Sequence, residues 1–208
     1  MNRTSLMDAP APPGVGAFSW PRPARHLLGL EGMTREALLD LLDLARRYRE
    51  KLRTPRWTSD ELKGVAVCNA FFEDSTRTRV SFELAEQRLG AIHTTFTVSG
   101  SSISKGETML DTLRVLEAMG VELVVVRHRS AGAAAFLARH LEAGIINAGD
   151  GEHEHPTQGL LDLLTLSDAW SARFEGRRMA IVGDIAHSRV ARSAIFGLTA
   201  LGAEVTVT

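Results

Sequence analysis

Hydroxyl and guanidinium side chains are concentrated where one apolar run gives way to a helical pattern. Residues 75–79 read S-T-R-T-R and directly follow the apolar run of residues 65–72. The free N–H groups and positive dipole of a helix N-terminus attract anions, and guanidinium groups form charge-assisted hydrogen bonds with phosphate oxygens. This segment therefore predicts a phosphate-binding site. The simpler alternative is a helix cap flanked by surface arginines.

Further polar segments follow other apolar runs that predict strands. They are residues 99–108, 127–129, 147–158 and 183–189. Each carries at least one side chain that is or can become a cation, namely Lys105, Arg127, His155 or Arg189. Ligands of parallel α/β proteins bind beyond the carboxyl ends of the strands, so these groups predict one pocket for a small, highly charged anion.

Two histidines, His153 and His155, alternate with carboxylates, which raises the possibility of a metal site. No third ligand stands at metal spacing, so the sequence predicts no metal and no cofactor. Pro156 suits the first position of a helix and directs His155 and Gln158 toward the same crevice. The sequence lacks a phosphate loop of the Gly-x4-Gly-Lys-Ser/Thr type and a G-x-G-x-x-G motif after a strand, which disfavours nucleotide binding.

The elements that position these groups follow from the apolar pattern. The expected strands are residues 65–72, 92–98, 121–126, 144–148, 178–183 and 204–208. The expected helices are residues 34–52, 76–89, 108–119, 131–143, 157–169 and 188–201. Apolar strands that alternate with helices run parallel and are buried on both faces, so the pattern predicts a doubly wound α/β fold. Cys68 falls inside an expected strand and is interpreted as a core residue.

Composition excludes several classes of protein. The chain has 208 residues, of which 44% are hydrophobic and 24% charged, which is typical of a globular protein rather than a disordered one. The formal net charge of -1 provides no field for recruiting nucleic acid or an anionic membrane. A single cysteine, no apolar run of about 18 residues and no signal-peptide pattern lead us to expect a cytoplasmic location.

Four segments together resemble the carbamoyltransferase family. They are FFEDSTRTRVSFE (71–83), SSISKGET (101–108), NAGDGEHEHPTQGLLDL (147–163) and VGDIAHSRVARS (182–193). The last two favour the branch of the family that uses aspartate over the branch that uses ornithine. The resemblance implies transfer of the carbamoyl group of carbamoyl phosphate to the amino group of L-aspartate, giving N-carbamoyl-L-aspartate and phosphate, a step of de novo pyrimidine biosynthesis.

The resemblance also implies roles for individual residues. The residues expected to bind carbamoyl phosphate are Ser75, Thr76, Arg77, Thr78, Arg127, His155, Gln158, Ser101 and Lys105. Thr78, Arg127 and His155 are expected to polarise the carbonyl, and Lys105 to join them as a catalytic residue. Arg189 and Lys105 are expected to bind aspartate. Glu73 matches a residue associated with domain closure, and Arg79 is expected to anchor its loop through ion pairs.

The same resemblance implies an assembly and a domain organisation. Ser101 and Lys105 lie on a loop that reaches the neighbouring subunit's site, so a homotrimer with shared sites is expected, and regulatory or pathway-enzyme subunits are possible partners. Residues 1–25 are expected to be a flexible Pro/Ala-rich extension, residues 26–170 the carbamoyl phosphate-binding domain, and residues 171–208 the first, incomplete part of a Rossmann-like aspartate-binding domain. Two alternatives stay open: a carbamoyltransferase for another amine such as ornithine, and a non-catalytic anion-binding assembly subunit.

Overall fold

The computed structural model describes residues 25–97 and 108–208. The expectations for the N-terminal extension and for Ser101 and Lys105 therefore concern residues outside the described part, apart from Arg25. The helices are α1 (Arg35–Lys51), α2 (Thr76–Leu89), α3 (Met109–Ala118), α4 (Ala133–Ala138), α5 (Pro156–Ala169) and α6 (Arg189–Ala200). The strands are β1 (Ala66–Phe71), β2 (Ile92–Thr97), β3 (Leu123–His128), β4 (Gly144–Asp150), β5 (Arg178–Ile181) and β6 (Glu204–Val207).

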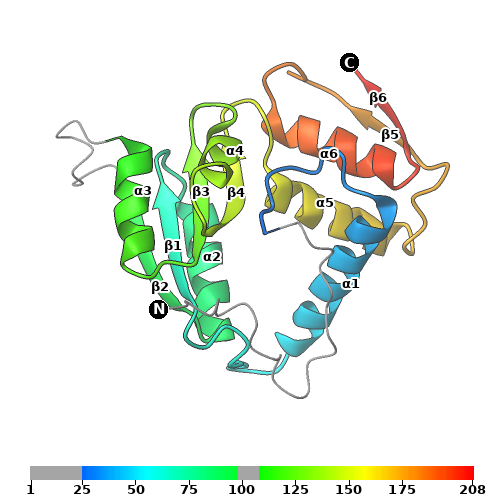
Figure 1. Cartoon of the computed structure of the whole chain (residues 1–208). Coiled ribbons are helices and arrows are strands. Elements are labelled where there is room, and N and C mark those ends of the chain that lie inside the picture. The colour runs from blue at the N-terminus through cyan, green and yellow to red at the C-terminus, as the bar shows by residue number, and fades with distance from the viewer. Residues whose placement is uncertain (1–24, 98–107) are drawn as a thin grey trace.

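The larger sheet is parallel throughout and has the strand order β2-β1-β3-β4 (Figure 1). Strand β1 therefore lies between β2 and β3, and the chain first adds β2 on one side of β1 and then β3 and β4 on the other. The crossover reverses direction between β1 and β3, which creates a topological switch point at the carboxyl ends of these two strands. The predicted doubly wound α/β architecture is confirmed.

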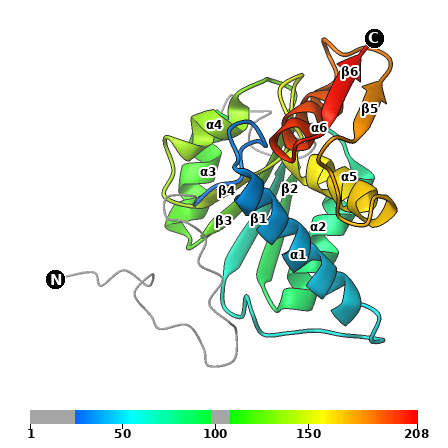
Figure 2. The same ribbon diagram turned by 90° about the vertical axis from the view of Figure 1, so that its right-hand side faces the viewer.

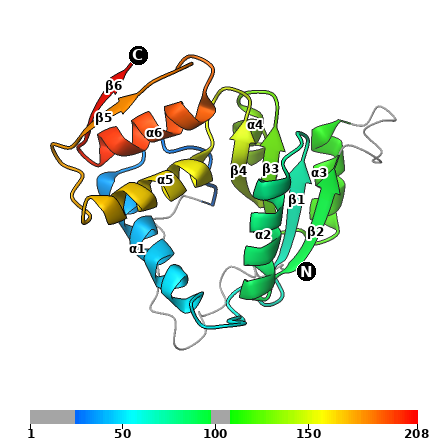
Figure 3. The same cartoon turned by 180° about the vertical axis from the view of Figure 1, so that it is seen from behind.

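Helices cover both faces of this sheet (Figures 1 and 3). Cys68 and Ala70 of β1 belong to the same buried cluster as Leu113 of α3 and Leu137 of α4. Val67 and Phe71 point to the other face, where Phe82 of α2 packs against them. Alternate residues of one strand thus contribute to two separate cores, which explains why its sequence shows no polar alternation.

A third core lies around helices α1, α5 and α6, beside the two-stranded parallel sheet β5-β6 (Figure 2). Its fully buried residues include Leu38 and Leu42 of α1, Leu163 of α5 and Leu198 of α6. Helix α1 begins at its expected cap, because the Thr34 hydroxyl accepts a hydrogen bond from the N–H of Ala37. Helices α5 and α6 pack side by side and lie between the two sheets (Figures 1 and 3).

Two boundaries differ from the expectations in ways that matter for the site. Strand β3 extends to His128 rather than ending at residue 126, so Arg127 is held within the sheet. The extension is stabilised by pairing with β4, where a register irregularity after Val126 aligns His128 with Asp150. Helix α4 spans only Ala133–Ala138, which is shorter than the expected residues 131–143. No helix among residues 25–97 and 108–208 is long and apolar enough to cross a bilayer.

Candidate active site

A cleft of about 1090 Å³ opens at the topological switch point. Its walls come from the N-terminal turns of α2 and α5, the end of β3 and the start of α6. The lining includes Ser75, Thr76, Arg77, Thr78, Arg127, His155, Gln158 and Arg189. Segments that lie far apart in the sequence thus meet in one place. All the expected site residues that the structure describes line this single cleft.

The N-terminus of α2 is open toward the cleft. Ser75 occupies the cap position, but its side chain makes no capping hydrogen bond, and the first turn contains no acidic residue. The hydroxyls of Ser75 and Thr78 and the exposed guanidinium of Arg77 lie around the positive end of the helix dipole. The alternative interpretation, an ordinary capped helix flanked by surface arginines, is disfavoured because the Ser75 side chain forms no capping hydrogen bond. Arg79 forms an ion pair of 3.8 Å with Glu83 one turn later in the same helix, so the expectation that Arg79 anchors the loop before α2 stays a prediction.

Glu73 joins the two arginines that converge on the cleft. Its carboxylate accepts a hydrogen bond of 3.2 Å from Arg127 and two of 3.0 and 3.1 Å from Arg189. Partial burial tends to raise the pKa of Glu73, but the hydrogen bonds and charges of Arg189 and Arg127 outweigh it and lower that pKa below its usual value. Burial, followed by the nearby charge of Arg189, lowers the pKa of Arg127. The three side chains form a compact group in which one carboxylate faces two cations.

Gly149 makes room for this group at the end of β4. Its φ is +114°, a conformation that L side chains rarely adopt, and a Cβ there would lie 3.1 Å from Arg127 Nη1 and 3.1 Å from Arg189 Nε. Arg127 also donates a hydrogen bond of 3.1 Å to the Ala148 carbonyl. Backbone and glycine together thus fix where both guanidinium groups lie. Sequence reasoning missed Gly149, although its position just after an apolar run was a usable signal.

His155 stands at the cap position of α5, immediately before Pro156, and lines the cleft. The residue is only 6% exposed. Burial, with Arg127 and Arg189 nearby, lowers the pKa of His155 to about 4, so its imidazole is neutral at physiological pH. The Thr157 hydroxyl lies 3.4 Å from its Nδ1. Gln158 also lines the cleft, and its amide donates a hydrogen bond of 2.9 Å to Asp162.

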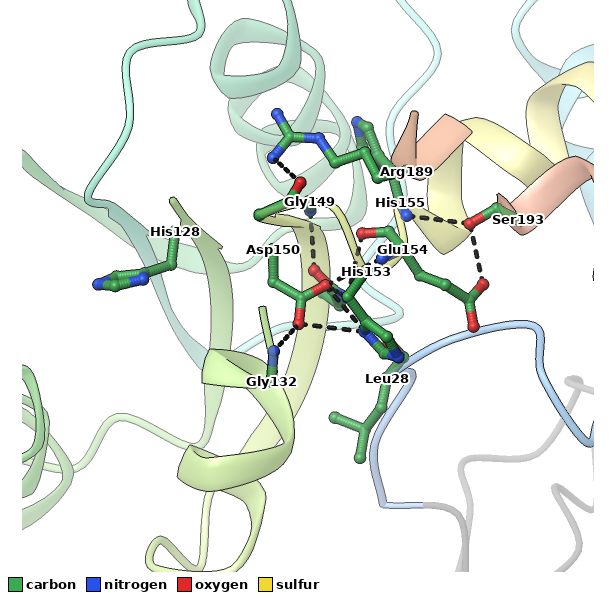
Figure 4. A network of polar contacts seen from close by, with 12 residues as sticks. Leu28, His128, Gly132, Gly149, Asp150, His153, Glu154, His155, Arg189 and Ser193 are labelled. Atoms are coloured by element: carbon green, nitrogen blue, oxygen red, sulfur yellow. Dashed lines mark hydrogen bonds and ion pairs between the residues drawn. The ribbon is translucent and has the colours of Figure 1, made fainter. Parts of the chain in front are cut away.

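A network of buried polar groups supports His155 from below (Figure 4). The N–H of His155 donates to the Ser193 hydroxyl at 2.9 Å, and that hydroxyl donates to Glu154 Oε2 at 2.9 Å. Glu154 is completely buried and also accepts hydrogen bonds from the N–H groups of Leu30 and Glu31. These contacts tie the start of α5 to α6 and to the segment before α1. Glu154 and Ser193 were not singled out as site residues in the sequence analysis.

Asp150 holds the other side of the same loop (Figure 4). Its buried carboxylate accepts hydrogen bonds from Asn147 Nδ2 at 2.7 Å and from the N–H of Gly132 at 2.8 Å. His153 Nδ1 lies 3.1 Å from Asp150 Oδ1. Because the Asp150 and Glu154 carboxylates each accept several hydrogen bonds, they fix the backbone that leads to His155.

The fold also supplies a third potential metal ligand that sequence spacing did not reveal. Potential ligand atoms of Glu31, His153 and Glu154 all lie within 4.8 Å of one another. However, the Glu154 carboxylate already receives three donors, and His153 is directed toward Asp150. Glu154 and His153 therefore already have hydrogen-bond partners within the protein, and no cation is needed to explain their positions. The expectation that the protein uses no metal stays a prediction.

A smaller cavity of about 400 Å³ adjoins the cleft on the far side of Arg189. Its lining includes Glu73, Arg129, Glu152 and His187. The hydrogen bond and charge of Asp184 raise the pKa of His187. Arg189 and Val190 line both cavities, whereas Glu73 lines only the smaller one.

The fold and the cleft place this chain among the doubly wound α/β proteins whose ligand site lies at a switch point. Sequence comparison makes the assignment specific, because the profile of the aspartate/ornithine carbamoyltransferase carbamoyl-P binding domain matches residues 25–168. The chain belongs to this family.

Close relatives are aspartate carbamoyltransferase catalytic subunits. The protein from Gluconacetobacter diazotrophicus is 54% identical over 188 residues, which are 90% of this chain and 58% of the relative. The protein from Chlorobaculum tepidum is 55% identical over 183 residues, covering 88% of this chain and 59% of the relative. The chain thus spans somewhat under two thirds of the length of these curated relatives.

Solved structures give the same picture. Aspartate transcarbamoylase from Trypanosoma cruzi, in complex with aspartate and phosphate, superposes with a TM-score of 0.80 at 33% identity. The alignment covers 88% of this chain and 59% of that one. The catalytic subunit of M. jannaschii aspartate transcarbamoylase gives a TM-score of 0.78 at 40% identity, and the alignment covers 88% of this chain and 59% of that one.

Proposed function

We propose that this protein is an aspartate carbamoyltransferase, which transfers the carbamoyl group of carbamoyl phosphate to L-aspartate in de novo pyrimidine biosynthesis. One observation carries the proposal: the open N-terminus of α2 faces Arg127 and His155 across one cleft, in a chain whose relatives are aspartate carbamoyltransferase catalytic subunits. The α2 N-terminus suits a dianionic phosphate, and Arg127 and His155 suit a carbonyl group that is joined to that phosphate. We also propose a cytoplasmic location, in keeping with the free thiol of Cys68.

The N-terminal turn of α2 is the proposed phosphate cradle. Ser75, Thr76, Arg77 and Thr78 supply hydroxyl, backbone and guanidinium donors around one point. Each charge-assisted hydrogen bond to a phosphate oxygen contributes about 1.5–3 kcal/mol, so a few are sufficient to bind a small dianion. Arg127 extends the cradle from the opposite wall, where it reaches both the phosphate and the carbonyl oxygen.

The carbonyl oxygen is the proposed focus of catalysis. Thr78, Arg127 and His155 donate hydrogen bonds to it and stabilise the negative charge that develops when an amine attacks the carbonyl carbon. The low pKa of His155 suits this task, because a neutral imidazole donates one hydrogen bond without needing to change its charge. Gln158 holds the carbamoyl amide. A new C–N bond forms, the bond from the carbonyl carbon to the phosphate oxygen breaks, and the departing phosphate takes the proton of the amine.

Arg189 is the proposed ligand of an aspartate carboxylate. In the structure its guanidinium is paired with Glu73, so an incoming carboxylate must compete with Glu73 or share Arg189 with it. Arg189 belongs to α6 while Arg127 belongs to β3, so Glu73 links two parts of the fold that each hold one substrate. The position of Glu73 thus supports the proposed role in closing the site around both substrates.

We further propose that Ser101 and Lys105 complete the site of a neighbouring copy within a homotrimer. Both residues lie outside the described part of the chain, so the resemblance to the family is what supports this assignment. The ammonium group of Lys105 would then contact both carbamoyl phosphate and aspartate. Regulatory or pathway-enzyme subunits are proposed as further partners on the same ground.

The phosphate cradle is tested by titrating carbamoyl phosphate into the protein in a calorimeter. We expect one site per chain and at least about tenfold weaker binding in Arg77→Ala, because one charge-assisted contact with phosphate is lost. Arg139→Ala, at the exposed end of α4, is the matched control and should bind as the wild type does. Equal affinities of the wild type and Arg77→Ala would refute the cradle.

A further inference from the structure

Beneath the cleft, a polar pair is enclosed between β1 and α2. Asn69 of β1 is 0% exposed and Glu86 of α2 is 5% exposed. Asn69 Nδ2 donates a hydrogen bond of 2.7 Å to Glu86 Oε2. On the same face of β1 as Asn69 lie Val67 and Phe71, which belong to the apolar cluster under α2. The proposed reaction assigns no role to either member of this pair.

Each residue of the pair has one buried side-chain oxygen that lacks a hydrogen-bond partner. Asn69 Oδ1 and Glu86 Oε1 accept no hydrogen bond from residues 25–97 and 108–208. An ionised carboxylate offers only acceptors, so it cannot satisfy the amide oxygen of Asn69. Leaving buried acceptors unsatisfied is costly, and a buried charge without an ion-pair partner is costlier still. Within the described ranges no lysine or arginine forms an ion pair with Glu86.

We propose that Glu86 is a neutral carboxylic acid in the folded protein and forms a cyclic acid–amide pair with Asn69. One proton on Glu86 Oε1 resolves both mismatches at once. It donates to Asn69 Oδ1, while Asn69 Nδ2 donates to Glu86 Oε2 as observed. Two hydrogen bonds then join the two side chains, both oxygens that lacked a partner take part in them, and the pair carries no charge inside the apolar layer.

The surroundings of Glu86 favour the protonated form. Burial raises the pKa of Glu86, and the charge of Glu83 on the same helix acts in the same direction. The hydrogen bond from Asn69 and the charge of His93, on the neighbouring strand β2, act in the opposite direction and do not cancel the effect of burial. Cys68, also on β1, stays a neutral thiol, because burial raises its pKa to about 11.

The pair makes the stability of the packing between β1 and α2, two elements beside the cleft, depend on pH. Helix α2 presents residues 75–78 at its N-terminus, and β1 leads directly to Glu73. Glu86 keeps its proton in the folded state but loses it in the unfolded chain above about pH 4.5. The contribution of the pair to stability is therefore complete below that pH and decreases as the pH rises toward the folded-state pKa.

Carbon-13 NMR of protein labelled at the glutamate side-chain carboxyl carbons tests the protonation state directly. Glu86→Gln identifies the Glu86 signal by its disappearance. We expect this signal to stay at the chemical shift of a protonated acid as the pH rises past about 4.5, where exposed glutamates titrate. A Glu86 signal that titrates together with the exposed glutamates would overturn the proposal.

The Glu86→Gln variant also gives an independent thermodynamic test, because a glutamine amide reproduces both hydrogen bonds without a titratable proton. Relative to this variant, the unfolding equilibrium constant of the wild type should rise up to about tenfold per pH unit above pH 4.5, until Glu86 ionises in the folded state. Glu122→Gln, an exposed change, should keep the wild-type pH dependence. Identical pH dependence in the wild type and Glu86→Gln would overturn the proposal, whether or not the carbamoyltransferase assignment holds.

Discussion

At the scale of single residues, two arginines that we propose serve anionic substrates are paired with one carboxylate, that of Glu73. Arg127 and Arg189 converge on Glu73 because the ends of β3 and β4 lie near the start of α6, and Gly149 leaves space there. The guanidinium groups keep Glu73 ionised, and they in turn help to keep His155 neutral. The chemistry we propose therefore depends on charge states that the site itself sets.

His155 should affect turnover more than binding. In His155→Ala we expect kcat to fall about 10²–10³-fold, which is typical for the loss of one donor to a developing oxyanion. The KM for carbamoyl phosphate should change much less, since the α2 cradle stays intact. Steady-state kinetics measures both constants. A rise in KM as large as the fall in kcat would mean that His155 serves binding rather than the transition state.

The low pKa of His155 also predicts a pH dependence of stability. The unfolded chain takes up this proton near pH 6.5, whereas the folded chain does so only near pH 4. The contribution of His155 to the free energy of unfolding should therefore be complete above pH 6.5 and should decrease as the pH falls toward 4. Urea unfolding at several pH values measures this, with His155→Gln as the comparison. The same acid sensitivity in both proteins would contradict the assignment.

At the scale of elements, the site depends on how closely α5 and α6 approach each other. Gly159 of α5 and Gly197 of α6 lie in this interface, where a Cβ on Gly197 would come within 2.6 Å of Leu163 Cδ1. This contact positions two residues of the cleft, because His155 is the N-cap of α5 and Arg189 is the first residue of α6. The hydrogen bonds of Ser193 and Glu154 then fix the relative position of the two helix starts.

Gly197→Ala should destabilise the protein despite the higher helix propensity of alanine. Overpacking against Leu163 and Leu30 costs about 1–3 kcal/mol, which exceeds the gain of at most about 1 kcal/mol from propensity. A fall of a few degrees in the unfolding midpoint is expected. Thr199→Ala, an exposed change in the same helix, is the control and should not lower the midpoint. An unchanged or higher midpoint in Gly197→Ala would show that the interface can relax.

Elements and cleft residues were predictable from sequence, but their connections were not. Apolar periodicity located all the described strands and helices, and the rule that ligands bind at strand ends pointed to Arg127, His155 and Arg189. Contacts between residues far apart in the chain left no local pattern. Glu154 accepts a hydrogen bond from Leu30, and Glu86 accepts one from Asn69. Glu31 lies near His153. None of these pairs follows from sequence spacing alone. The need for glycine at positions such as Gly149 becomes clear only when the side chains that lie next to it are known.

At the scale of the whole molecule, the proposed function joins two packed units through one cleft. The four-stranded sheet supplies the phosphate cradle and Arg127, while α6, beside the β5-β6 sheet, supplies Arg189. Glu73 forms the link between them. Assembly into a trimer would add a third contributor, since Lys105 is proposed to serve a neighbouring copy. Activity should then be a property of the assembly.

Mixing two inactive variants tests the sharing of sites. Arg77→Ala and Lys105→Ala should each be nearly inactive alone. After dissociation and reassembly together, a copy with an intact Arg77 should receive an intact Lys105 from a neighbouring Arg77→Ala copy, so activity should reappear. Native mass spectrometry verifies that mixed trimers have formed. Mixed trimers without activity would contradict the shared site.

The central claim is the reaction itself, and the most direct measurement is a mass-spectrometric assay for the ureido product. The wild-type protein is supplied with carbamoyl phosphate and either L-aspartate or L-ornithine. We expect N-carbamoyl-L-aspartate in the first reaction and no carbamoylated product in the second. A product from ornithine alone would assign the protein to the other branch of its family, and no product with either amine would contradict the catalytic function.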